Sequence, residues 1–141
     1  MKTKPIYLLT LIALMLALYL SGCAGQASAG DTPETAPEQV VQAFYDWYLG
    51  DRAAGPKDIH DSAQISAGLL ARYDEAMQAA TPGNVISFVC AQDFPDSVSV
   101  GSAAMQGDTA VVPVASSFGN TIEMTLIPVD GVWQIDNVTC K

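Results

Sequence analysis

The feature of this sequence that most restricts its fold is a change in hydrophobic period near Pro82. Before Pro82, apolar residues recur at steps of three and four, which is the spacing of one face of a helix. After Pro82 the period becomes two, and Gly, Asn and Asp mark turns between the apolar runs, as in antiparallel strands. Helices followed by an antiparallel meander predict an α+β fold, with N-terminal helices packed on a curved antiparallel sheet.

Two helices are expected before the change of period. The first follows Thr35, because Thr35 and Glu38 have the spacing of a capping box, and it ends at Gly50 in a left-handed turn. The second begins at about Ser66 and stops at Thr81-Pro82-Gly83. Their apolar stripes consist of Val40, Val41, Phe44, Trp47 and Tyr48 in the first helix and Leu69, Leu70, Tyr73 and Met77 in the second.

Five strands are expected after the helices. An apolar run from Val85 to Ala91 forms the first of them, and Gln92-Asp93-Phe94-Pro95 breaks it. The other four are Ser97 to Met105, Thr109 to Ser116, Thr121 to Val129, and Val132 to Val138. Asp130-Gly131 between the last two is the sharpest hairpin signal of the set.

The N-terminal segment has the features of a signal peptide. Lys2 and Lys4 precede an apolar stretch, Ile6 to Leu20, that is too short to read comfortably as a membrane span. The sequence Leu20-Ser21-Gly22-Cys23 that follows resembles the bacterial lipobox, in which the cysteine is lipidated and the peptide is cut before it. Cleavage near Ala27 or Ala29, or an uncleaved anchor helix, is the alternative.

This interpretation divides the chain into three parts. Residues 1–22 are a lipoprotein signal peptide, residues 23–36 are a flexible tether that begins with lipidated Cys23, and residues 37–141 are a single α+β domain. The implied location is the bacterial cell envelope, with the lipid as the membrane contact. Ala24 after the cysteine resembles the usual sorting signal for the outer membrane, facing the periplasm, if the host has two membranes.

The charge of the chain excludes nucleic acid as a partner. Removal of residues 1–22 takes away Lys2 and Lys4 but none of the 15 acidic residues, which leaves four basic residues and a net charge of −11 with His60 neutral. Nucleic-acid binding requires basic patches that neutralise phosphates. The acidic residues are scattered and are read mainly as solvated surface.

Once Cys23 is lipidated, Cys90 and Cys140 remain as an even pair. In an oxidising compartment two such cysteines most often form a disulfide, here between the strand expected at 85–91 and the end of the last strand. Zinc needs three or four clustered ligands, and the sequence offers these two thiols with one distant histidine, His60. No metal and no cofactor are therefore expected.

Five segments together resemble an uncharacterised family of secreted bacterial domains. They are PEQVVQAFYDWYL from Pro37, ISAGLLARYDEAM from Ile65, CAQDFPDSVSV from Cys90, GDTAVVPV from Gly107 and DGVWQIDNVTC from Asp130. That family has the nuclear-transport-factor-2-like, or cystatin-like, fold, and the resemblance covers the chain from Pro37 onward. It implies a cone in which the sheet curls around the helices. It implies no particular activity, because such a cone holds a ligand, a catalytic site or nothing.

Candidate site residues follow from this cone. Tyr45, Tyr48, Tyr73 and Asp93 would line a pocket in it, although helical spacing places tyrosines of this kind more often in the core. His60, beside Asp58 and Asp61, and Asp93 are the candidate proton acceptors for catalysis. No nucleophile motif accompanies them, and the turn-like setting of Asp93 favours a carboxylate that caps backbone N–H groups.

The sequence favours a membrane-anchored protein without catalytic activity. It would bind a small apolar or peptide ligand in the cone, or present a surface to an envelope protein or to a second copy of itself. The alternatives are a small enzyme that uses Asp93 or His60 with a tyrosine, and a purely structural accessory of the envelope. The location of Asp93 in the fold separates the first two.

Overall fold

A computed structural model of the chain describes residues 33–51, 57–79 and 86–141. The chain divides into two units, residues 1–30 and 31–141, and the description below concerns the second. The expected signal peptide and the lipidation site Cys23 lie outside the described residues. None of the helices in the described ranges combines the length and apolarity needed to cross a membrane.

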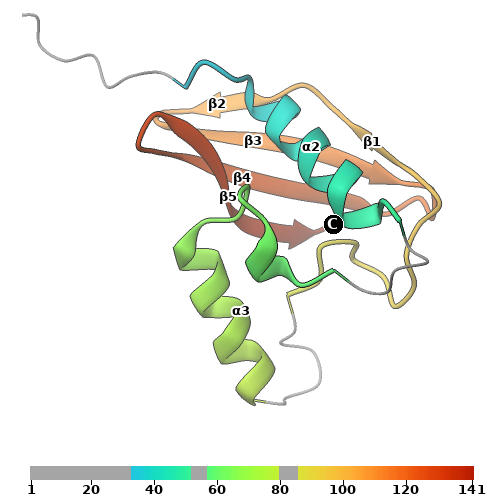
Figure 1. The fold of residues 1–141 in the computed structure, drawn as a ribbon. Coiled ribbons are helices and arrows are strands. Elements are labelled where there is room, and N and C mark those ends of the chain that lie inside the picture. Colours follow the sequence, from blue (N-terminus) through green and yellow to red (C-terminus); the bar gives the residue numbers. More distant parts are fainter. Residues whose placement is uncertain (1–32, 52–56, 80–85) are drawn as a thin grey trace, which may run out of the picture. The chain divides into compact units, whose positions relative to one another are not determined.

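The fold is α+β, as predicted (Figure 1). In chain order its elements are helix α2 (Pro37–Leu49), the short 3-10 helix η2 (Ile59–Asp61), helix α3 (Ala67–Ala79), and strands β1 (Val98–Val100), β2 (Ala104–Gln106), β3 (Thr109–Ser116), β4 (Thr121–Val129) and β5 (Val132–Cys140). The strands form one antiparallel sheet in the order β1-β3-β4-β5, and β2 also pairs with β3. Helix α2 packs against β1, β3 and β5, whereas α3 packs against β5.

One face of the sheet forms the core. Alternate residues along β3 and β4 are buried, as the period of two requires, and the intervening ones are more exposed. The buried apolar residues of the sheet are Ala110, Val112, Val114, Ile122, Met124, Leu126, Trp133 and Ile135. Helix α2 covers this face with Val40, Val41, Phe44 and Tyr45, so the apolar stripe predicted for the first helix does face the core.

The ends of α2 differ from the prediction. The helix begins at Pro37 with Ala36 as its N-cap, and no side chain caps it, so the capping box of Thr35 and Glu38 does not form. A proline favours the first helical position and pushes the residue before it into extended backbone, which displaces Thr35 from the cap. Gly50 is also extended, with φ −70°, and Asp51 takes the left-handed conformation instead.

The prediction of a strand from Val85 to Ala91 is wrong for the described residues 86–91. Residues 86–91 form bends without strand pairing, and the neighbours Phe88 and Val89 are both buried, whereas a strand would point them to opposite faces. Cys90 has a left-handed backbone with φ 52°, which ends any extended run. The segment is a buried loop rather than a strand, and Asn120 Nδ2 donates to the Cys90 carbonyl at 3.0 Å.

The strand predicted at Ser97 to Met105 is divided by a bulge. Val100 pairs with Val114, and Ala104 pairs with Val111. Between these two pairs the edge chain advances by four residues and β3 by three, so the edge chain has one extra residue. Gly101 N donates to the Pro113 carbonyl at 2.8 Å inside the bulge. Pro113 has no N–H to offer at that same edge, and a bulge is a place where a sheet tolerates proline.

Replacing Gly101 with alanine should therefore destabilise the domain. The added Cβ would lie 2.8 Å from Pro113 Cγ and 3.2 Å from its carbonyl oxygen, which forces the bulge to shift. We expect a loss of about 1–3 kcal/mol in the free energy of unfolding, measured by urea titration. Adding Pro113→Ala should recover part of this loss, and Ser99→Ala, at the exposed position of β1, serves as the control. Equal free energies of unfolding for Gly101→Ala and the wild type would contradict the close packing of Gly101 against Pro113.

A second bulge docks α3 on the sheet. Thr125 pairs with Asn137 and Leu126 with Ile135, so Asp136 is the extra residue of β5. Ser66 Oγ donates to Asp136 Oδ1 at 2.6 Å and accepts from Leu69 N at 3.0 Å, so Ser66 caps α3 and holds it to β5. Arg72 also donates to the Asp136 carbonyl.

Helix α3 is attached mainly through its first turns. Leu69 is fully buried, and Ile65, just before the helix, forms a parallel bridge with Ile135. Leu70 and Tyr73 are only half-buried, and Met77, which was predicted to lie on the same stripe, is 51% exposed. The apolar period was correct for the start of this helix but not for its end.

Candidate functional site

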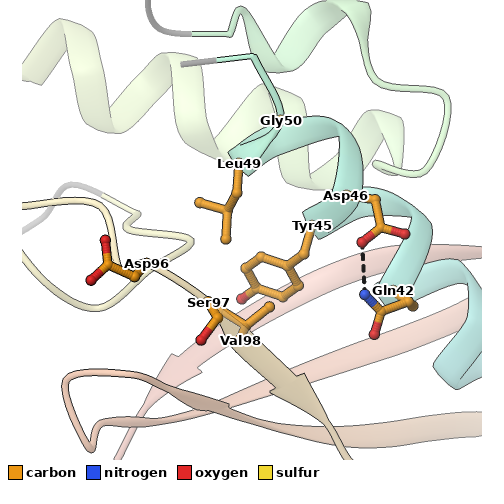
Figure 2. Close-up of a pocket in the computed structure, with 8 residues that line it drawn as sticks. All are labelled: Gln42, Tyr45, Asp46, Leu49, Gly50, Asp96, Ser97 and Val98. Atoms are coloured by element: carbon orange, nitrogen blue, oxygen red, sulfur yellow. Dashed lines mark hydrogen bonds between the residues drawn. The ribbon is translucent and has the colours of Figure 1, made fainter. Parts of the chain in front are cut away.

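A hollow of about 270 Å³ lies between α2 and the segment that leads into β1 (Figure 2). Its lining consists of Gln42, Tyr45, Asp46, Leu49, Gly50, Asp96, Ser97 and Val98. Helical spacing brings Gln42, Tyr45, Asp46 and Leu49 to one side of α2, because residues three and four apart are neighbours on a helix surface. The hollow is open to solvent, and its lining is more polar than apolar.

The rim carries two carboxylates. Figure 2 shows Asp46 and Asp96 on opposite sides of Tyr45, one from α2 and the other from the segment before β1. Gln42 Nε2 donates to Asp46 Oδ1 at 2.8 Å, and the Asp96 backbone N–H donates to Ser117 Oγ at 3.0 Å. None of the eight lining residues is basic, so the hollow favours a cation over an anion.

Gly50 is required at the end of α2 by close packing. A Cβ at this position would lie 2.5 Å from the Asp46 carbonyl oxygen, nearer than such atoms approach in proteins. Gly50 therefore lets the chain turn away from the helix close to the Asp46 carbonyl, where a larger residue would clash. The prediction placed a glycine here for left-handed backbone, whereas the actual reason is steric.

An aromatic cluster shares Tyr45 with the hollow. The cluster consists of Phe44, Tyr45, Trp47, Tyr48, Tyr73, Phe88 and Phe94. Phe44 stacks on Tyr48 with ring centroids 5.3 Å apart, and Phe88 lies 5.3 Å from Phe44. Phe94 is 41% exposed and lies 5.7 Å from Tyr48, so the cluster reaches the surface beside the C-terminal end of α2.

Tyr45 connects the cluster to the buried loop. Its side chain is 1% exposed, and its hydroxyl donates to the Phe88 carbonyl at 2.7 Å. Burial raises the pKa of Tyr45 well above its ordinary value, with a smaller contribution from nearby Tyr48. Burial likewise raises the pKa of Tyr48, with Tyr73 adding to the effect. Both phenols are held in their neutral form, so neither is poised to act as a base near neutral pH.

Alkaline pH should destabilise the domain through these tyrosines. Above the ordinary tyrosine pKa of 10.0 the unfolded chain loses protons that folded Tyr45 retains, so stability is full below about pH 10 and falls as pH rises further. Tyr45→Phe should remove part of this pH dependence. It should also cost about 1–3 kcal/mol at neutral pH, because the Phe88 carbonyl loses its buried donor. Urea titrations at pH 8 and at high pH measure both effects, and equal pH slopes in the two proteins would contradict the assignment.

The structure brings together three of the four residues predicted to line a pocket. Tyr45, Tyr48 and Tyr73 all belong to the aromatic cluster, and Tyr45 also lines the hollow. Asp93 is exposed in the segment before β1 and is not among the lining residues. The predicted group of three tyrosines and an aspartate is therefore divided between a mostly buried cluster and the surface.

His60 lies elsewhere, in η2. Its Nε2 is 3.0 Å from Asp74 Oδ1 of α3, and both side chains are 46% exposed. The side chain of Asp58 accepts from the His60 backbone N–H at 3.0 Å and caps η2. The histidine joins η2 to α3 through an exposed contact and does not line the hollow.

The predicted disulfide is confirmed. Cys90 and Cys140 are bonded, with their Cα atoms 5.5 Å apart. It joins the end of β5 to the buried loop, rather than to a strand as predicted. In the ranges 33–51, 57–79 and 86–141 no group of three or more His, Cys, Asp or Glu side chains is placed to hold a metal ion.

Sequence reasoning missed most of the hollow. Of the eight lining residues, Tyr45 was predicted to line a pocket, and Ser97 was predicted only as the first residue of a strand. The available signal was that Gln42, Asp46 and Leu49 lie one turn apart on a face beside the core stripe. That spacing does not reveal which other segment lies opposite them.

Comparison with known proteins finds a likeness to a solved structure. No protein-family model and no curated protein matches the chain. The chain is similar to one chain in the crystal structure of the type VI effector-immunity complex Tae3-Tai3 from Ralstonia pickettii, solved with selenomethionine. The TM-score is 0.61, with 25% identity over 75% of this chain and 97% of that one. In the native crystal of the same complex the TM-score is 0.61 and the identity 26%, over 75% and 95%.

Proposed function

We propose that this chain is an extracytoplasmic, lipid-anchored protein that binds a partner protein without catalysing a reaction. The partner we propose is a type VI effector, which the chain would neutralise as an immunity protein. The observation that carries this proposal is the similarity to a chain of the Tae3-Tai3 complex, which extends over 97% of that chain. A likeness that leaves so little of the other chain unmatched supports a shared role as well as a shared architecture.

The arrangement of polar groups also favours binding over catalysis. Chemistry requires two or more polar groups within hydrogen-bond reach of one reacting atom. Here Asp93 is exposed, His60 pairs with Asp74, and the Tyr45 hydroxyl donates to a backbone carbonyl. The groups on which an enzyme would depend therefore lie in three different environments.

The effector proposal is tested by coproduction in bacteria. The full-length chain would be produced with Ralstonia pickettii Tae3, and separately with Tae3-like effectors from its own host, each directed outside the cytoplasm. We expect the chain to restore growth and to co-elute with at least one effector in size-exclusion chromatography. A folded, disulfide-bonded chain that neither protects nor co-elutes would overturn the proposal, and an assembly of this chain alone would indicate self-association instead.

The membrane anchor rests on Leu20-Ser21-Gly22-Cys23. We expect full-length protein produced in bacteria to incorporate a palmitate analogue and to lose its first 22 residues, as read by mass spectrometry. Cys23→Ser should abolish the label and release the protein from membranes, because the lipid supplies the membrane contact. Equal labelling of the variant would contradict lipidation at this cysteine. Effector binding should persist in Cys23→Ser, since the substitution changes none of the residues that form the described fold.

A further inference from the structure

We infer that two exposed phenylalanines at one end of the sheet, Phe94 and Phe118, form the surface through which this chain binds its effector. The inference rests on the proposed function, and it adds the part of the domain that makes the contact and the chemistry of the partner. On the partner, this contact requires apolar pockets for the two rings, with basic residues around them. Three observations carry the inference: the exposure of the rings, the rigidity of the loops that hold them, and the charge of the chain.

Both rings are large apolar groups that the fold leaves in contact with solvent. Phe94 is 41% exposed, in the segment before β1, and Phe118 is 51% exposed, in the turn between β3 and β4. A phenylalanine stabilises a fold mainly through the apolar area that it buries, so rings as exposed as these contribute little to folding. Aromatic side chains are enriched at the centre of protein interfaces, where a partner removes this area from water.

Hydrogen bonds hold the two loops side by side at one end of the sheet (Figure 1). The Asp96 backbone N–H donates to Ser117 Oγ at 3.0 Å, and the Ser117 backbone N–H donates to the Ser97 carbonyl at 3.0 Å. Phe94 lies two residues before Asp96, and Phe118 directly follows Ser117. The two rings therefore extend from neighbouring stretches of backbone, and a single partner can contact both.

The loops are fixed before a partner arrives. In the turn, the Gly119 N–H donates to the Ser116 carbonyl at 2.9 Å and the Phe118 N–H donates to Ser116 Oγ at 3.3 Å. Phe94 packs against Tyr48 of α2, with ring centroids 5.7 Å apart. A surface that is already ordered loses less conformational entropy on binding, so more of the contact energy appears as affinity.

The charge of the chain favours a basic partner over a second copy. The net charge is −9, and Asp93 is exposed directly before Phe94. Two copies meeting at this surface would bring like charges together, which costs free energy, whereas basic residues on a different protein would be attracted. The partner that fits is therefore a protein with basic residues around its apolar pockets.

The affinity of single variants for an effector tests this surface. For an effector that the full-length chain binds, Phe118→Ala and Phe94→Ala should each raise Kd by roughly tenfold or more, because buried aromatic anchors carry much of the energy of an interface. Met105→Ala is the control, since Met105 is 57% exposed and pairs with Ala110 at the opposite end of β3. Its Kd should stay nearly unchanged. Raising the NaCl concentration should weaken the wild-type complex, because salt screens attraction between opposite charges.

The outcomes separate this inference from the proposed function. Equal Kd values for Phe118→Ala and wild type, with the effector bound, would overturn the phenylalanine contact and leave the proposed function intact. If Phe94→Ala unfolds in urea too readily to be measured, Phe118→Ala alone decides. A Kd that is insensitive to NaCl would overturn the basic partner surface. A dimer of the wild type that Phe118→Ala abolishes in size-exclusion chromatography would assign the surface to a second copy and overturn the inference. If no effector binds, the proposed function and this inference fail together.

Discussion

Replacing Cys90 and Cys140 together with serine should lower the free energy of unfolding by about 4 kcal/mol. The disulfide closes a loop with a sequence separation of 50, and a crosslink of this length removes much of the conformational freedom of the unfolded chain. Total stabilities of native domains are about 5–15 kcal/mol, so the variant should be close to unfolding at ambient temperature.

The disulfide also has a local role in the folded state. Cys90 ends the buried loop that carries Phe88, and the Phe88 carbonyl accepts from Tyr45. Without the crosslink, this loop is held by side-chain packing and by the bond from Asn120 to the Cys90 carbonyl. We therefore expect the tyrosine and phenylalanine rings near it to become more mobile in the double variant.

The measurement is urea unfolding of the oxidised wild type, the reduced and alkylated wild type, and Cys90→Ser/Cys140→Ser. The double variant should unfold at a much lower urea concentration, and the alkylated protein should do so too. A thiol assay of the unreduced wild type should find neither cysteine free. Equal midpoints for the oxidised and double-variant proteins would show that the crosslink contributes little.

Phe44→Ala should cost about 3–5 kcal/mol, which is the second large effect. Phe44 is fully buried, and its ring centroid lies 5.3 Å from those of Tyr45, Tyr48 and Phe88. Alanine removes these ring contacts and leaves a cavity between α2 and the buried loop. Neighbouring rings cannot fill such a space without leaving their own contacts.

A matched pair of substitutions isolates the effect of burial. Phe118→Ala removes the same atoms from a residue that is 51% exposed in the turn between β3 and β4. We expect that control to change stability by no more than about 0.5 kcal/mol. Phe44→Leu should fall between wild type and alanine, because it retains part of the volume. Similar losses for Phe44→Ala and Phe118→Ala would contradict the position of Phe44 at the centre of the cluster.

The sequence by itself determined the parts of this protein that depend on near neighbours along the chain. The predicted bounds of two strands, Thr109 to Ser116 and Thr121 to Val129, match β3 and β4. Asp130-Gly131 forms the expected hairpin, with φ of 50° and 76° at its two residues. The stripe of α2 and the pairing of the two cysteines were also predicted, because period, turn chemistry and cysteine number can be read without knowing the tertiary contacts.

Tertiary contacts decided the remainder. The apolar run at 86–91 is a loop because both Phe88 and Val89 find buried positions and Cys90 turns back to meet Cys140. Gly101 bends its strand because Pro113 lies opposite, and α3 begins where Ser66 meets Asp136, 70 positions away in the chain. The hollow exists because Asp96 and Ser97 come to lie beside α2. Period and propensity report contacts within a few residues, whereas these features arise from groups far apart in the chain.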